Sequence, residues 1–442
     1  MFRVFLTGLA FLYSIGVWAE DNSVFAARRE ILMKKIEGTV AVLQGAPDTR
    51  AYAAFRQDNN FYYLTGVEVP DSLLLLDAAK HRSILFLPNW SRESARWDGL
   101  KLSPGPEARR RTGIEEVLDV SQFEAELEKR NGNLRALYTP FSPQETAATS
   151  RDRALQHDSA REKDPWDGRP SRETAFENKL RAKLSPLVSI RNLSPFLDEM
   201  RRIKDTQEVE LLRMAGRIGA LGLSEAIRSS EPGMFEYQVA AVAEFIFSLN
   251  GSAGPAFYPI VGSGPNSCIP HYDRNSRRMA TGDVVVFDFG PDYRYYQSDI
   301  TRTFPISGKF TGEQAKVYQV VLEAQKAALE KVRPGATFGV LNEAVQEVLE
   351  RYGYGNYTMH AVSHYVGMST HDVGVSDTFE PGVVIAVEPG VYLPDKNLGI
   401  RIEDTVLVTR DGHEVLTGNV PKEIAEIEKL MSEKGLADAI KK

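Results

Sequence analysis

Residues 282–304, GDVVVFDFGPDYRYYQSDITRTF, form the stretch on which the prediction of the fold depends. Within it, residues 284–287 are a short β-branched and aromatic run that ends on the carboxylate of Asp288, and such a run predicts a strand. A glycine, a proline and an aspartate at positions 290–292 predict a turn, and a second strand-like segment that carries Asp299 follows. If the two segments pair as an antiparallel hairpin, the two carboxylates approach each other across it.

Two carboxylates at contact distance repel each other unless a cation lies between them or they share a proton. Because both would be buried beside much apolar chain, a bound metal is the favoured interpretation of Asp288 and Asp299. The alternative is one strand-terminal aspartate and one turn aspartate, both solvated, and for an isolated pair that alternative is preferred. A metal site therefore requires further ligands from elsewhere in the chain.

The composition is that of a globular protein of two or three domains. The chain has 442 residues, of which 43% are hydrophobic and 26% charged. A formal net charge of −7 argues against a nucleic-acid partner. The single cysteine, Cys268, excludes an internal disulfide and is interpreted as a packing residue.

Residues 1–19 are interpreted as a secretory signal peptide. Arg3 supplies the positive charge, residues 4–17 supply the apolar region, and Ala19 ends a cleavage motif of small residues. The apolar run is shorter than the roughly 20 residues that cross a bilayer, so no stable membrane anchor is expected. The mature protein is therefore predicted to begin at Glu20 and to be exported, either to the periplasm or out of the cell.

The first half of the mature chain alternates between predicted helices and strands, which suggests an α/β domain. The aromatic segment 60–66 is assigned to its core. Residues 142–170 are polar and contain prolines, so they are predicted to be a long surface loop or linker. Helices are predicted at 26–36, 121–129 and 172–183, and strands at 39–43, 72–76, 84–87 and 188–193.

The second half opens with a helix whose start has the pattern of a capping box, with Asp205 as the cap and Glu208 reaching back. This helix is predicted to run to about residue 228. Three more helices are predicted at 236–249, 312–332 and 338–352. Residues 360–409 are predicted to form short strands separated by glycine and proline turns.

The further ligands that the aspartate pair requires are found in this second half. Four of the seven histidines lie between positions 271 and 371, and His364 is among them. Glu388 ends an apolar strand-like run, and Glu403 shares one face of the next strand with Arg401. Four carboxylates and one imidazole suit two divalent ions about 3.5–4 Å apart. Oxygen-rich ligation favours Mn²⁺ over Zn²⁺. The predicted ligands are Asp288, Asp299, His364, Glu388 and Glu403.

In order and spacing these residues resemble those of the pita-bread metallopeptidases, and most closely the Xaa-Pro aminopeptidases (aminopeptidase P) and their prolidase relatives. The resemblance implies an α+β fold, in which an N-terminal α/β creatinase-like domain at 20–195 precedes a pita-bread catalytic domain at 196–442. It covers nearly the whole mature chain. The matching segments are 26–129, 200–205, 288–290, 298–303, 360–364, 387–390 and 399–404.

The resemblance also implies a role for each site residue. Asp288 would chelate one metal, Asp299 and Glu403 would bridge the pair, and His364 and Glu388 would complete the other ion. Glu388 would also serve as the general base for the bridging water. The other implied roles are a place near the leaving side for His271, oxyanion stabilisation for His371, orientation of Glu403 by Arg401, and substrate binding by Tyr392 and His360.

The chain departs from the family pattern at three places. Ala361 and Thr370 stand where relatives usually carry Gly and Val. The loop 372–381 contains no Arg or Lys, whereas dipeptide-specific relatives are expected to use an arginine there to bind the substrate carboxylate. This absence favours an aminopeptidase over a dipeptidase.

The sequence thus predicts an exported Xaa-Pro aminopeptidase with two divalent metal ions, Mn²⁺ being favoured and Zn²⁺ or Co²⁺ being alternatives. Its expected partners are peptides with proline at the second position and further copies of itself in a homo-oligomer. The alternatives are an Xaa-Pro dipeptidase on the same fold and a non-catalytic binding protein that kept the scaffold.

Overall fold

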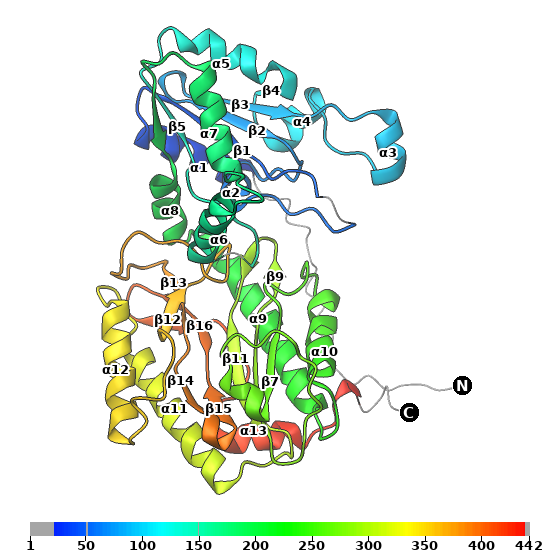
Figure 1. Ribbon diagram of the computed structural model, residues 1–442, viewed down its shortest axis with the longest axis vertical. Helices are drawn as coiled ribbons and strands as arrows, with labels where there is room; N and C mark the ends of the chain where they lie inside the picture. Colours follow the sequence, from blue (N-terminus) through cyan, green and yellow to red (C-terminus); the bar gives the residue numbers. More distant parts are fainter. Residues whose placement is uncertain (1–21, 50–51, 149, 438–442) are drawn as a thin grey trace. The chain divides into compact units, whose positions relative to one another are not determined.

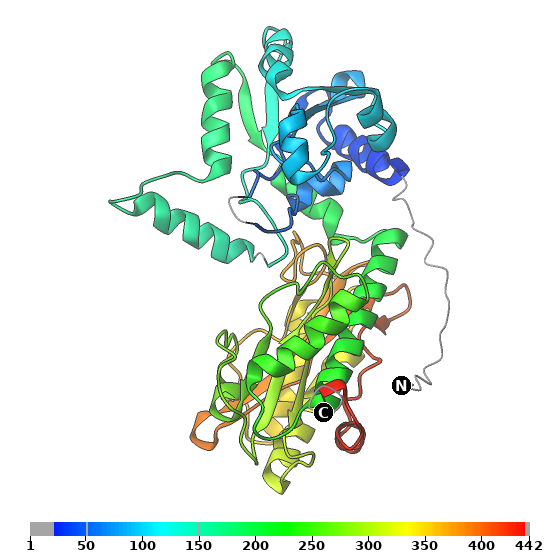
Figure 2. The ribbon, with the colours of Figure 1, turned by 90° about the vertical axis from the view of Figure 1, so that its right-hand side faces the viewer.

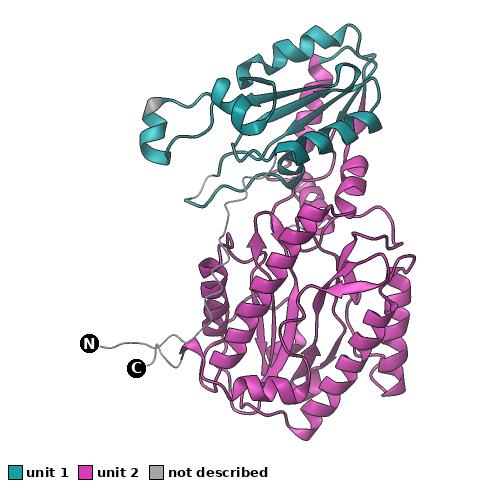
Figure 3. Cartoon of the chain, turned by 180° about the vertical axis from the view of Figure 1, so that it is seen from behind, with its two compact units in different colours: residues 1–138, 184–189 teal, residues 139–183, 190–442 magenta. Residues whose placement is uncertain are grey.

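A computed structural model describes residues 22–49, 52–148 and 150–437, apart from the side chain of Arg92. The predicted signal peptide, residues 1–19, lies outside the described residues. Two compact units are formed, one from residues 1–138 and 184–189 and the other from residues 139–183 and 190–442 (Figure 3). This division differs from the single boundary predicted between residues 195 and 196, because residues 139–183 group with the second unit.

A mixed sheet has the strand order β4-β3-β2-β1-β5-β6, and the first unit is built on its strands β1 to β5 (Figure 1). Strands β1, β2 and β3 pair antiparallel, whereas β4 pairs with β3 and β5 with β1 in parallel. The strands are β1 (Val40–Gln44), β2 (Leu73–Asp77), β3 (Arg82–Leu87), β4 (Glu116–Asp119), β5 (Ala136–Thr139) and β6 (Ser189–Asn192). The helices are α1 (Asn22–Lys35), α2 (Asn59–Thr65), α3 (Arg92–Asp98), α4 (Pro106–Thr112) and α5 (Phe123–Asn131).

The aromatic segment assigned to the core is helix α2, and every one of its residues is buried. Asp58 caps its first turn by accepting a hydrogen bond from the backbone of Phe61. Gly66 ends the helix with φ of 64°. A side chain at Gly66 would also collide with the ring of Phe25, 2.4 Å from the position of a Cβ atom. Position 66 therefore requires glycine, both for the left-handed backbone conformation and for the close contact with Phe25.

The second unit contains two helix pairs, each followed by antiparallel strands (Figures 1 and 2). The capping box at Asp205 is present at the start of the first long helix. The first group comprises α9 (Thr206–Ser229), α10 (Glu236–Leu249), β7 (Ile260–Ser263), β8 (Val284–Phe289) and β11 (Ile300–Pro305), with a small hairpin of β9 (Asp292–Tyr293) and β10 (Tyr296–Gln297). The second comprises α11 (Gly312–Lys331), α12 (Phe338–Arg351), β12 (Ser363–Tyr365), β13 (Val384–Val387), β14 (Gly390–Leu393), β15 (Leu398–Arg401), β16 (Asp404–Val408) and β17 (His413–Val415). The remaining helices of this unit are α6 (Arg151–Lys163), α7 (Arg172–Lys183), α8 (Ser194–Arg202) and α13 (Ile424–Met431).

The predicted antiparallel hairpin is formed by β8 and β11, with Asp288 opposite Thr301. The aromatic rings of Phe287 and Phe289 stack on each other in the core, 4.3 Å apart. At Gly290 the chain passes so close to the carbonyl of Ser298 that a Cβ atom would lie 1.6 Å from that oxygen. The glycine therefore allows the two strands to approach each other directly beside the aspartates.

The prediction of a continuous loop over 142–170 is wrong, because helix α6 spans thirteen of these residues. None of its side chains is buried, so the helix lacks the apolar periodicity by which helices are recognised in a sequence. Among the described residues, no helix has the length and apolar character needed to cross a membrane.

Candidate metal centre

The five predicted ligands come from the ends of different strands of the second unit. Asp288 lies near the end of β8, and Asp299 immediately precedes its partner β11. His364 lies in β12, Glu388 follows β13, and Glu403 lies between β15 and β16. The ligand atoms of Asp299, His364 and Glu403 all lie within 4.8 Å of one another. His364 Nε2 is in addition 3.5 Å from Glu388 Oε1.

The carboxylates of this cluster cannot all be ionised without a compensating charge. Burial raises the pKa of Asp299 well above its usual range, and the negative charges of Glu403, Asp288 and Glu388 raise it further. Glu403 is shifted in the same direction by burial and by Asp288 and Glu388. Burial raises the pKa of Glu388 to about 8. A cation among these groups would remove their mutual repulsion.

The donor atoms suit a divalent cation. Asp288 Oδ1 and Asp299 Oδ1 are buried, and within the described part of the chain neither has a hydrogen-bond partner. Burial lowers the pKa of His364 to about 4, which keeps the imidazole neutral. Its Nδ1 donates to the carbonyl of Tyr365 at 3.0 Å, so the lone pair of Nε2 faces Asp299 and Glu388. Unpaired buried oxygens and an oriented neutral imidazole are features of a metal site.

Arg401 has a different direct partner from the one that the resemblance implied. Its Nη2 donates to Asp288 Oδ2 at 2.7 Å, and it reaches Glu403 only through the hydroxyl of Thr301. Thr301 Oγ1 accepts from Arg401 Nε at 3.3 Å and donates to Glu403 Oε2 at 2.6 Å. Arg401 therefore orients Asp288 directly and Glu403 indirectly. No pattern in the sequence marks Thr301 as the link between Arg401 and Glu403, because this contact joins residues about 100 positions apart.

Tyr392 and His360, the predicted substrate-binding residues, contact each other. The Tyr392 hydroxyl accepts from Arg401 Nη1 at 2.7 Å and lies 2.8 Å from His360 Nε2. The Nδ1 atom of His360 is 3.6 Å from Glu388 Oε2. Burial lowers the pKa of His360 to about 4. Tyr392 is thus hydrogen-bonded to both Arg401 and His360, and the ring of His360 lies beside Glu388 at this edge of the site.

The two remaining histidines lie beside the cluster. The ring of His371 stacks on that of His364, with centroids 3.9 Å apart and 13° between the planes. Burial and the neighbouring His364 lower the pKa of His371 to about 3. His271 accepts a hydrogen bond at Nδ1 from Arg153, 2.8 Å away, and burial together with this arginine lowers its pKa. Both imidazoles are therefore neutral at physiological pH.

A single cavity of about 1040 Å³ is lined by the five predicted ligands, by Arg401 and by the other three histidines of the site, His271, His360 and His371. One of its walls comes from residues 144–157, which lie in the segment that the sequence predicted to be a surface loop or linker. This wall contributes Gln144, Ala148, Ser150, Arg153, Ala154 and His157. Sequence reasoning missed it, because no motif distinguishes Arg153 from the many other surface arginines.

Comparison with known proteins agrees with the fold and the site. Residues 210–410 match the model of metallopeptidase family M24, and residues 25–138 match that of the aminopeptidase P N-terminal domain. The chain is 32% identical over 446 residues to the Xaa-Pro aminopeptidase of Escherichia coli (strain K12), which covers 92% of this chain and 97% of the relative. It is similar in structure to the aminopeptidase PepP of Pseudomonas aeruginosa, with a TM-score of 0.80 at 31% identity over 93% of this chain and 98% of that one. The Xaa-Pro dipeptidase of Pyrococcus furiosus is 38% identical over 238 residues, which cover 53% of this chain and 68% of the relative.

An α+β fold with a buried centre of carboxylates and imidazole defines a two-domain metallopeptidase. The chain belongs to metallopeptidase family M24, carries the N-terminal domain of aminopeptidase P, and is a metallo-aminopeptidase. The predictions of the fold class and of the family are thereby confirmed.

Proposed function

We propose that this enzyme hydrolyses the bond between an N-terminal residue and a following proline, in peptides and with two divalent metal ions. The observation that carries the proposal is the convergence of Asp299, His364 and Glu403 within 4.8 Å. Relatives of nearly full length bear the name Xaa-Pro aminopeptidase. The bond before proline is a tertiary amide without an N–H, and this explains why a dedicated site serves it.

Five residues would hold the ions. When bound, such ions polarise the scissile carbonyl and lower the pKa of a water molecule. Glu388, between His360 and His364, would accept the proton of that water as general base. His371 is neutral and can donate its N–H to the oxygen on which negative charge develops. The five metal-holding residues are Asp288, Asp299, His364, Glu388 and Glu403.

The test is to strip the metal from the protein and to restore activity with Mn²⁺, Zn²⁺ or Co²⁺. Four carboxylates and one imidazole favour the harder Mn²⁺ ion, so we expect Mn²⁺ to restore the highest turnover of Gly-Pro-Ala. Elemental analysis should then give two ions per chain. A stoichiometry of one with full activity would contradict the dinuclear proposal, and no activity with any metal would favour a non-catalytic role.

The second candidate function is that of an Xaa-Pro dipeptidase, which the similarity to the Pyrococcus furiosus enzyme supports. Against it stands the loop 372–381, which contains no Arg or Lys. Burying a substrate carboxylate without a partner costs several kcal/mol, so Gly-Pro-Ala should exceed Gly-Pro in kcat/KM by at least about tenfold. Equal values would favour the dipeptidase.

The proposal includes export and self-association. The apolar segment after Arg3 supports cleavage behind Ala19. Intact-mass measurement of protein from the native host should therefore show Glu20 as the N-terminus, and retention of Met1 would contradict export. Light scattering during gel filtration should give a mass that is a multiple of the chain mass if the enzyme is a homo-oligomer.

A further inference from the structure

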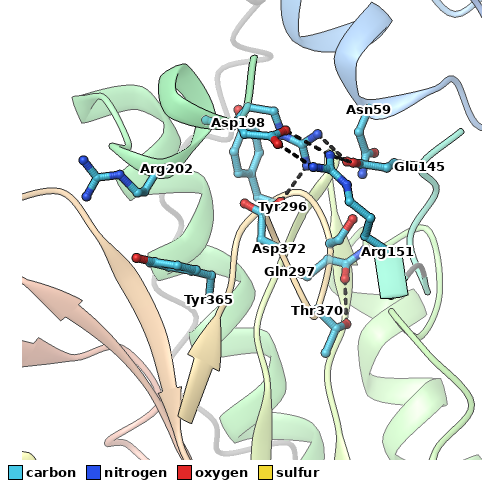
Figure 4. Close-up of polar contacts among 12 residues, drawn as sticks. Asn59, Glu145, Arg151, Asp198, Arg202, Tyr296, Gln297, Tyr365, Thr370 and Asp372 are labelled. Atoms are coloured by element: carbon cyan, nitrogen blue, oxygen red, sulfur yellow. Dashed lines mark hydrogen bonds and ion pairs between the residues drawn. The ribbon is translucent and has the colours of Figure 1, made fainter. Parts of the chain in front are cut away.

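The wall of the cavity formed by residues 144–157, here called the insert wall, is fixed by a buried network of ion pairs (Figure 4). Arg201 is 1% exposed and bonds to Glu145 on one side and to Asp372 Oδ1, 2.6 Å away, on the other. Arg151 bonds to the same Glu145 and to Asp198. One carboxylate of the insert wall thus joins two arginines, and the network continues to the residue that follows His371.

Contacts of the backbone and of one serine hydroxyl hold the insert wall directly against the segment that carries Ser369 and His371. Ser150 forms a parallel bridge with His371, and the hydroxyl of Ser369 donates to the carbonyl of Thr146 at 3.2 Å. Helix α6 begins at Arg151, which is held by the ion pairs. The first turn of α6, which carries Arg153, therefore has a fixed position relative to the catalytic histidines.

Arg153 differs from the arginines of this network in what it contacts. Arg151 and Arg201 each bond to two carboxylates. Arg153 is exposed to the cavity, and its partner within the described residues is the neutral His271. A guanidinium with a neutral partner retains its full charge and several free N–H donors.

The cavity carries acidic groups at the candidate metal centre and the positive charge of Arg153 on the insert wall, and a short peptide likewise has a positive amino end and a negative carboxyl end. The metal centre supplies four carboxylates. The other arginine of the lining, Arg401, is 2% exposed and already bonds to Asp288 and Tyr392. Arg153 is the guanidinium that an entering carboxylate can reach, and arginine binds a carboxylate with two parallel hydrogen bonds.

We propose that Arg153 binds the C-terminal carboxylate of short peptide substrates and makes the enzyme favour peptides that end inside the cavity. This inference rests on the proposed Xaa-Pro peptidase function. It assigns the carboxylate-binding cation to the insert wall for tripeptides such as Gly-Pro-Ala, and it leaves the expected preference for them over Gly-Pro unchanged.

The test compares each peptide with its C-terminal amide, which removes the negative charge and little else. Wild-type enzyme should hydrolyse Gly-Pro-Ala at least about tenfold better, in kcat/KM, than Gly-Pro-Ala-amide. In Arg153→Gln the ratio should fall to about one, and Arg153→Lys should keep part of it because the charge remains. Peptides of six residues, which extend out of the cavity, should show a ratio near one in both enzymes.

Lys163→Gln is the matched control, because it removes one positive charge from the far end of the same helix. This variant should keep the wild-type ratio. Calorimetric binding of Pro-Ala and its amide gives a readout that does not depend on turnover. Equal hydrolysis of acid and amide by wild type, or an unchanged ratio in Arg153→Gln, would overturn the role of Arg153. Failure to hydrolyse any Xaa-Pro peptide would instead overturn the proposed function, and this inference with it.

Discussion

Asp299 is a buried carboxylate that lies among other carboxylates and the neutral imidazole of His364, without a positively charged partner among the described residues. It is 4% exposed, and its pKa is raised by burial and by three other carboxylates. We predict that Asp299→Asn abolishes activity and lowers the metal content. Without metal, the same variant should be at least as stable to heat as wild type, because it removes one repelling charge. A solvated aspartate would instead change stability by less than about 0.5 kcal/mol and leave turnover normal.

Asp372 is also buried, but its charged neighbours lower its pKa, whereas those of Asp299 raise the pKa of Asp299. Burial alone would raise its pKa, whereas Arg201 and Lys204 hold it below the usual value. A lowered pKa means that the ionised form stabilises the fold above the unfolded pKa of about 3.9, and that this stability is lost as the pH falls through the folded pKa.

We therefore predict that Asp372→Asn lowers the free energy of unfolding by about 3 kcal/mol at pH 7, because Arg201 and Lys204 lose their shared charge. Urea denaturation measures this difference. It should shrink as the pH is lowered below about 4, and a difference independent of pH would contradict the ion-pair explanation.

At the scale of elements, the prediction was most accurate for helices whose own residues supply a cap and a periodic apolar face. Helix α9 has both a capping box and a buried apolar face, and its predicted extent was correct to within one residue. Helix α6 has neither, since its position depends on ion pairs with Asp198 and with residues that lie elsewhere in the fold. The five predicted metal ligands stand next to strand ends, where the sequence pattern placed them, and their role as ligands stays a prediction. The partner of Arg401 could not be predicted, because it depends on side-chain contacts between strands.

The loop that carries His271, residues 263–277, is held by one buried acid at the start of helix α10. Glu236 is 0% exposed and accepts hydrogen bonds from both sides of this loop. A glutamine at this position would place an N–H group opposite some of these donors, so the hydrogen bonds to that side of the loop would be lost. We predict that Glu236→Gln lowers kcat/KM about tenfold while the metal content stays normal. The measurements are steady-state kinetics and elemental analysis, and loss of metal would show that the whole site had collapsed. The donors are Ser263 N and Oγ, Asn266 Nδ2, Tyr272 Oη and Arg277 N.

At the scale of the whole molecule, the site is assembled from segments that are far apart in the sequence. Arg201 bonds to Glu145, 56 positions away, and to Asp372, 171 positions away. Such pairings cannot be inferred from composition or periodicity, because the local sequence does not distinguish a buried, paired arginine such as Arg201 from a surface arginine. This is why the sequence predicted the metal centre but not the insert wall that completes the cavity.

Because the predicted ligands are far apart in the sequence, we expect bound metal to stabilise the folded chain. The ligands extend from Asp288 to Glu403 and have no preformed arrangement in the unfolded chain, so the free energy of metal binding adds to the free energy of folding. Mn²⁺ at 100 times its Kd should raise the free energy of unfolding by about 2.7 kcal/mol for each ion bound.

Glu236→Gln keeps every ligand and should gain the same increment from a lower starting stability, whereas Asp299→Asn should gain much less. Thermal denaturation with metal and with chelator measures all three proteins. If chelation left the wild-type transition unchanged, the buried carboxylates would have to be neutralised by protons instead of a metal, and the metal centre proposed here would be wrong.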